Sequence, residues 1–156
     1  MLKKIATLVQ GAGHCVLATC GGEGAAPHTS LMSFCAADDC LEFWMASLAD
    51  TRKHRNLLAN PNASLLFDDR GLSGAAAGPS LALTVSARLA PFTSPELETL
   101  ALGALAARHP ALRDFLALEG VVPLRLQAVS FQLLSGLSDV FFIEAEKMLD
   151  AGTRRA

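Results

Sequence analysis

Strict alternation of apolar with small or polar side chains over residues 81–91, LALTVSARLAP, is the feature that most constrains the fold. Successive side chains of a strand point to opposite faces, so this pattern predicts a strand with one face in a core. Five further stretches are also typical of strands: residues 14–20, 28–34, 40–47, 62–69 and 124–136. Residues 138–145 extend or follow the last of them. Six strands joined mainly by short turns predict a mainly β fold, a six-stranded antiparallel barrel without exposed sheet edges.

Helical patterns separate some of these strands. Residues 2–11 predict a helix with Ile5, Leu8 and Val9 on one face, and residues 51–60 predict a second, short helix. A helical insert is expected over about 93–119, interrupted by a proline at position 110. Residues 70–80, RGLSGAAAGPS, have the composition of a loop. The 156 residues suffice for one domain with a proper core, so residues 1–156 are expected to form a single domain.

Composition narrows the possible function classes. The chain is 51% hydrophobic, with a mean hydropathy of +0.36, which indicates either a dense core or a surface buried against a partner. No apolar run reaches the roughly 18 residues that a membrane-spanning helix needs, and the N-terminus resembles an amphipathic helix more than a signal peptide. We therefore expect a cytoplasmic protein without a membrane segment. The net charge of −2 argues against a general nucleic-acid-binding protein.

The four cysteines, Cys15, Cys20, Cys35 and Cys40, form two C-x4-C pairs. Zinc sites usually use two-residue spacings, so no metal site is expected and free thiols are the favoured interpretation. No nucleophile and base pair stands out either, because His14 and Cys15 are adjacent and would point to opposite faces of a strand. The catalytic residues are thus left unassigned.

An unusual charge pattern marks the stretch ASLADTRKHRNLLANP, residues 46–61. Four basic residues, 52–55, crowd the start of the predicted short helix, which Asp50 is expected to cap. A helix N-terminus carries unpaired N–H groups and positive potential, so cations there cost stability unless an anion binds. The local character of this cluster favours a small anion over a polymer.

A phosphate group would suit this helix start, since Arg offers a planar fork, Lys a point charge, and hydroxyl groups further donors. The expected phosphate ligands are Ser47, Thr51, Arg52 and Lys53. The alternative is a solvated basic helix end that pairs with Asp50, Asp68 or Asp69. A dipole penalty of about 0.3–1 kcal/mol leaves both interpretations open. No dinucleotide or P-loop glycine motif is present, so a mononucleotide or a phosphorylated metabolite is the expected carrier.

The stretches CVLATCGGEGAAPHTSLMSF and LEFWMASLADTRKHRNLLANPNASLLFDD resemble the pyridoxamine 5′-phosphate oxidase-like proteins, the FMN-binding split β-barrels. The resemblance covers about residues 10–70. It implies FMN as the cofactor, with its phosphate held by Ser47, Thr51, Arg52 and Lys53 and with Ala46 beside that motif. It places Ser30, Leu31, Met32 and Ser33 along the ribityl chain and flavin ring. It also implies a homodimer with FMN at the subunit interface, which would account for the high hydrophobicity.

The sequence departs from this family at several points. The stretch 28–34 has no basic residue except His28, and the chain lacks the C-terminal substrate segment, rich in Trp, Arg and His, of true pyridoxamine phosphate oxidases. We therefore expect an FMN-dependent oxidoreductase acting on a small molecule other than a B6 vitamer. One alternative is a non-catalytic flavin- or heme-binding protein of the same fold, because relatives bind heme or deazaflavin. The other is a barrel with no cofactor.

Overall fold

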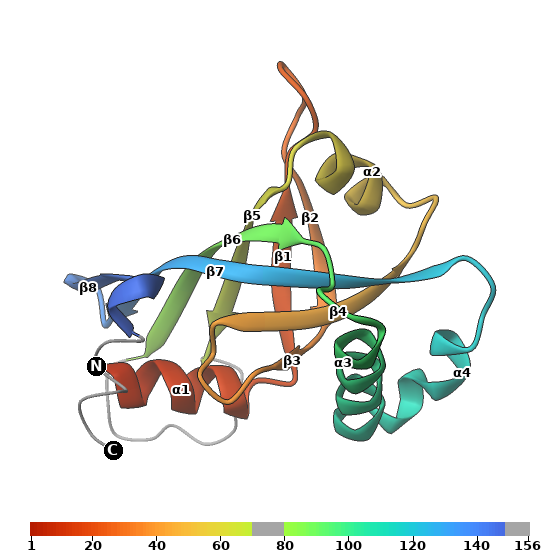
Figure 1. The fold of residues 1–156 in the computed structure, drawn as a ribbon. Coiled ribbons are helices and arrows are strands. Elements are labelled where there is room, and N and C mark those ends of the chain that lie inside the picture. Colours follow the sequence, from red (N-terminus) through yellow and green to blue (C-terminus); the bar gives the residue numbers. More distant parts are fainter. Residues whose placement is uncertain (70–79, 149–156) are drawn as a thin grey trace.

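A curled antiparallel sheet forms the body of the protein in the computed structural model, which describes residues 1–69 and 80–148. Its strands are β1 (His14–Thr19), β2 (His28–Ser33), β3 (Cys35–Ala36), β4 (Glu42–Leu48), β5 (Asn62–Asp68), β6 (Leu81–Ala90), β7 (Val121–Ser135) and β8 (Asp139–Glu144). The strand order is β2-β1-β5-β6-β7-β4-β3, with β8 paired to β7 (Figure 1). The expected mainly β split-barrel architecture is confirmed, with eight strands in place of six.

The two additional strands arise where the chain turns sharply. Gly136 has a φ of 68°, a conformation that favours glycine, and the turn that follows it separates β8 from β7. Residues 35–36 form β3, which pairs with β4. The described helices are α1 (Leu2–Gly11), α2 (Arg52–Ala59), α3 (Pro95–Arg108), the 3-10 turn η1 (Pro110–Leu112) and α4 (Arg113–Leu116). The second half of the predicted insert is thus shorter than a full helix: η1 and α4 together end at Leu116, and residues 117–120 form turns.

Strand β7 ties the two halves of the sheet together. Its first part pairs with β4 and its last part with β8, while β6 runs along nearly its whole length. The register with β6 shifts at Val129, where Ser86 faces Ser130 but Ala87 faces Ala128. Such a bulge leaves one residue unpaired and bends the strand. It therefore helps the sheet to curl.

The inward faces of the strands form the core. The rings of Phe34, Phe43 and Phe67 meet at its centre, with Phe34 and Phe67 edge to face at a centroid distance of 5.1 Å. Helix α1 packs against β5 and β6 and buries Ile5, Leu8 and Val9, as its periodicity predicts. It lies across one end of the curled sheet (Figure 1).

Two arginines fasten the helical insert to the barrel. Nη2 of Arg108, at the end of α3, donates to the backbone oxygens of Gln10 at 2.6 Å and Ala12 at 2.7 Å, and its guanidinium lies over the Phe34 ring. Arg125 of β7 donates through Nη1 to the oxygen of Pro91, just before the insert, at 2.7 Å.

Arg125 also binds Glu42 of β4 through both carboxylate oxygens. Its hydrogen bonds are the main cause that holds the pKa of Glu42 below its ordinary value. The pair thus ties β4 to β7, and Arg125 links both strands to the chain just before the insert.

Two expectations fall outside the described residues or extend beyond them. The loop expected at residues 70–80 lies outside them except for Ser80. The expected single domain over residues 1–156 stays a prediction. None of the helices in the two described ranges combines the length and apolar character needed to cross a membrane.

Candidate functional site

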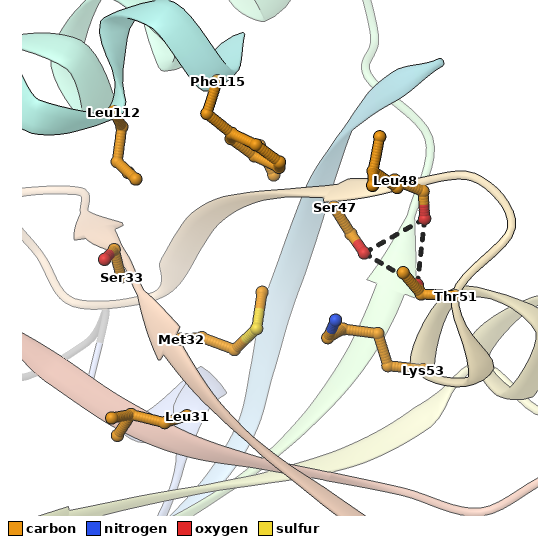
Figure 2. A pocket seen from close by; sticks show the side chains of 10 residues that line it. Leu31, Met32, Ser33, Ser47, Leu48, Thr51, Lys53, Leu112 and Phe115 are labelled. Carbon is orange, nitrogen blue, oxygen red and sulfur yellow. Dashed lines mark hydrogen bonds between the residues drawn. The ribbon is translucent and has the colours of Figure 1, made fainter. Parts of the chain in front are cut away.

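A cavity of about 290 Å³ lies between β2 and β4, the strands near the two opposite ends of the sheet order. Its described lining is Leu31, Met32, Ser33, Ala46, Ser47, Leu48, Thr51, Lys53, Leu112 and Phe115. Seven of the nine predicted site residues are therefore brought together at one place. Figure 2 shows that β2 forms one side, the end of β4 and the start of α2 another, and the insert a third.

The end of the cavity near α2 is polar. The hydroxyls of Ser47 and Thr51 lie 2.8 Å apart, and both approach the backbone oxygen of Leu48, at 3.2 Å and 2.9 Å (Figure 2). Ser47 is buried, with 2% of its surface exposed. A bound anion could take the place of the Leu48 oxygen as the acceptor for one of these hydroxyl protons.

Helix α2 adds positive potential at the same end. Thr51 is its N-cap and accepts from the backbone N–H of His54 at 3.4 Å, so the expected cap at Asp50 is wrong. The reason is geometric, because Thr51 directly precedes the first helical residue, and a cap side chain must reach the N2 or N3 N–H group. The described residues provide no acceptor for the N–H groups of Arg52 and Lys53. These two donors suit an anion.

The four basic residues of α2 have different surroundings. Lys53 is half-buried and its side chain points into the cavity (Figure 2). Arg52 is exposed and points away, with Nη2 at 3.4 Å from the Ala26 oxygen. His54 and Arg55 contact the backbone oxygens of Ala49 and Asp50. Among the described residues, Lys53 is therefore the cation that lines the site, and Arg52 is not part of the lining.

The alternative interpretation, a basic helix end neutralised by nearby carboxylates, gains no support. Among the described residues, no carboxylate forms an ion pair with Arg52, Lys53 or Arg55. Arg55 binds the backbone oxygen of Asp50, not its side chain. The positive end of α2 is thus left without an internal counter-ion in the described part of the chain.

Strand β2 lies at the edge of the sheet, so one side of its backbone has no strand partner within residues 1–69 and 80–148. Leu31, Met32 and Ser33 line the cavity from this edge, with Met32 buried and Leu31 73% exposed. Ser30 does not line it, and its hydroxyl lies 3.3 Å from Nε2 of His28. An open strand edge of this kind can bind an extended ligand through its backbone.

Three lining residues, Leu48, Leu112 and Phe115, were not predicted from the sequence. Leu48 follows the predicted Ser47 directly. Leu112 and Phe115 belong to the insert and are spaced three residues apart, which places them on one face of a helical turn. That spacing was the available signal, but nothing local shows which part of the barrel the face would meet.

The cysteines lie apart from this cavity lining. All four are free thiols, with Cys15 and Cys40 buried. Burial raises the pKa of Cys15 to about 12, which makes it an inert thiol at neutral pH. Within residues 1–69 and 80–148, no three His, Cys, Asp or Glu side chains lie in a group that could hold a metal ion.

The family model described as pyridoxamine 5′-phosphate oxidase matches residues 1–127, which include every residue of the described cavity lining. The chain belongs to the pyridoxamine 5′-phosphate oxidase family. This confirms the family resemblance expected from the stretches around residues 10–70. No curated protein matches the sequence.

Solved structures show the same fold. A heme binding protein from Mycobacterium smegmatis has a TM-score of 0.78 at 14% identity, over 96% of this chain and 60% of that one. General Stress Protein 26 from Bacillus anthracis has a TM-score of 0.65 at 19% identity, over 91% of this chain and 96% of that one. HutZ, the heme storage protein from Vibrio cholerae, has a TM-score of 0.62 at 19% identity, over 89% of this chain and 92% of that one. This chain thus spans about three fifths of the mycobacterial protein.

Proposed function

We propose that the protein binds FMN in the cavity between β2 and β4 and acts as an oxidoreductase on a small molecule. The observation that carries the proposal is the polar end of the cavity. The Lys53 side chain and the hydroxyls of Ser47 and Thr51 line that end, beside the start of α2, where two N–H groups have no acceptor among the described residues. These are the donors that a phosphate monoester needs.

The rest of the lining fits the other parts of FMN. The open edge of β2 offers backbone groups to the ribityl chain, and Met32 and Ala46 offer apolar surface to a flat ring. The flavin would supply hydride or electron transfer, while the protein binds it, orients it and limits water around it. Arg52, expected to bind the phosphate directly, would act only through its charge near the start of α2.

We further propose that FMN lies at the interface of a homodimer. The volume of the cavity, about 290 Å³, is just below the roughly 300–1,000 Å³ usual for ligand sites, so a second subunit could complete it. Leu31 lines the cavity and pairs across the sheet with Val16, which in turn pairs with Leu66, so a row of apolar residues runs from the cavity across the sheet. Leu31 is 73% and Leu66 41% exposed, and both share the outer face of the sheet. Such a patch marks an interaction surface.

Heme is the competing ligand, because similar folds include the M. smegmatis and V. cholerae proteins named for heme. Heme iron usually takes His, Cys, Met or Tyr as an axial ligand. The described cavity lining contains Met32 but no His, Cys or Tyr. This composition favours FMN.

The cytoplasmic location remains a prediction.

Riboflavin provides a matched ligand, since it carries the same ring and ribityl chain without the phosphate. Purified protein freed of small molecules would be titrated with FMN, riboflavin and heme, following flavin fluorescence and the heme Soret band. We expect FMN to bind at least about tenfold more tightly than riboflavin, the effect of one charge-assisted hydrogen bond of about 1.5 kcal/mol. Equal affinities would contradict the phosphate site. Binding of heme alone would support the heme-binding alternative.

Two measurements address turnover and assembly. Anaerobic reduction of the bound flavin by NADH or NADPH, followed by reoxidation with a small-molecule acceptor, distinguishes an enzyme from a carrier. Light scattering coupled to gel filtration gives the oligomeric state. A monomer that binds FMN at full affinity would contradict an interfacial site.

A further inference from the structure

The insert segment that overhangs the cavity is fixed to both strands that bound it. Before η1, Nε2 of His109 lies 2.9 Å from the backbone oxygen of Phe34, the residue that follows β2. After α4, the N–H of Ala49, which follows β4, donates to the Gly120 oxygen at 2.9 Å. Gly120 has a φ of +81° at the turn into β7. Residues 109–120 therefore span the opening of the split barrel as a tethered wall.

This wall presents apolar side chains to the cavity. Leu112 and Phe115 line it and face β2 across the opening (Figure 2). The two charged residues between them, Arg113 and Asp114, are exposed and are not part of the lining. The cationic side chain of the described lining is Lys53, which sits at the α2 end. The two ends of the site thus differ in chemistry.

We propose that Leu112 and Phe115 select an uncharged aromatic or alicyclic molecule as the second ligand of the site. This proposal rests on the proposed function, since the phosphate of FMN would engage Lys53. A substrate with its own phosphate would then find no second cation in the described lining. A charge placed against an apolar wall loses hydration without compensation, whereas an uncharged ring packs against Phe115 favourably. Residues 109–120 are thus the specificity-determining segment.

A matched pair of probes tests this selectivity. At pH 7, 2-naphthol is uncharged and 2-naphthalenesulfonate is an anion of nearly the same shape. Both would be titrated calorimetrically into FMN-loaded and FMN-free protein. We expect 2-naphthol to bind at least about tenfold more tightly than 2-naphthalenesulfonate. This difference corresponds to the free-energy cost of burying one polar group without a hydrogen-bond partner.

Variants then locate the effect. Phe115→Ala is expected to weaken 2-naphthol binding about fivefold, the magnitude of one lost aromatic contact. Arg113→Ala, an exposed change in the same short helix, should leave it unchanged. Leu112→Lys places a cation on the wall and should increase the affinity for the sulfonate, which keeps the test valid if Phe115→Ala does not fold.

The outcomes separate the two proposals. If the protein binds FMN but shows no preference for 2-naphthol, the selectivity proposal is overturned and FMN binding stands. The same holds if Phe115→Ala keeps the preference and Leu112→Lys gains no affinity for the sulfonate. Absence of FMN binding overturns the proposed function. The titrations of FMN-free protein would then decide the wall's selectivity, and no preference in either form refutes it.

Discussion

Replacing Lys53 by alanine is expected to weaken FMN binding much more than the same replacement at the neighbouring Arg52. Each change removes one positive charge from the first turn of α2, so their effects on the general potential are similar. They differ in contact, because the Lys53 side chain lines the cavity while Nη2 of Arg52 lies 3.4 Å from the Ala26 oxygen. Arg52→Ala is therefore the matched control.

The structure allows the difference to be estimated. Lys53 is half-buried, so its contact with a phosphate would be partly shielded from water. A hydrogen bond to a charged group contributes about 1.5–3 kcal/mol, which corresponds to about 10- to 150-fold in Kd. Arg52 is exposed, and a solvent-exposed charge contributes about 0–1 kcal/mol, at most about fivefold.

Flavin fluorescence titrations of the three proteins, each with FMN and with riboflavin, would measure this. Lys53→Ala should lose affinity for FMN and keep its affinity for riboflavin, because riboflavin lacks the group that Lys53 binds. The remaining Arg52 effect should shrink in 0.5 M salt through screening. Circular dichroism would confirm that both variants are folded. Equal losses in the two variants would show that potential, not contact, holds the anion, and a parallel loss of riboflavin would refute the phosphate assignment.

Three further predictions concern the scaffold and the assembly. Glu42→Gln should lower the free energy of unfolding by about 1–3 kcal/mol at pH 7, since it leaves the largely buried Arg125 without its charged hydrogen-bond acceptor. Arg125 lowers the folded-state pKa of Glu42, so this contribution to stability is present above the ordinary pKa of 4.5 and is lost as the pH falls through the folded-state pKa. Urea titrations of the wild-type protein and Glu42→Gln should therefore converge in acid. Arg108→Ala should cost about 2–4 kcal/mol in the same assay, as two backbone acceptors lose a charged donor and Phe34 loses its cationic neighbour. Leu31→Asp should dissociate the proposed dimer in light scattering, and an unchanged mass would contradict the proposed interface.

The strands could be predicted from the sequence because their signal is local. In β6, the buried residues Leu83, Val85 and Ala87 alternate as the pattern of residues 81–91 indicates. The division of the last strand was left open, although Gly136 lies at the turn that separates β7 from β8. The bulge at Val129 had no local signal, since it depends on how β6 and β7 align. The register between distant strands therefore could not be predicted from the sequence alone.

The same distinction applies to the site. Ser47, Thr51 and Lys53 lie within one strand-turn-helix unit, so charge and capping rules could locate them together. Arg52 belongs to the same unit, but the side chain of its neighbour Lys53 points toward the cavity while that of Arg52 contacts the Ala26 oxygen. Only the three-dimensional structure distinguishes the two residues. Phe115 joins the site from more than sixty residues away. Its position depends on two backbone tethers that no pattern in the insert reveals.

The separate origins of the two ends of the cavity have a consequence for how the site can change. The polar end comes from one contiguous segment, residues 46–54, and is held by hydrogen bonds within that segment. The apolar wall comes from the insert and is held by contacts at its two ends, His109 with the Phe34 oxygen and Gly120 with the Ala49 N–H. Side chains between those tethers can therefore vary without disturbing the start of α2. We expect substitutions at Leu112 and Phe115 to alter which second ligand binds while leaving the grip on the phosphate unchanged, as is usual for distant sites with no shared partners.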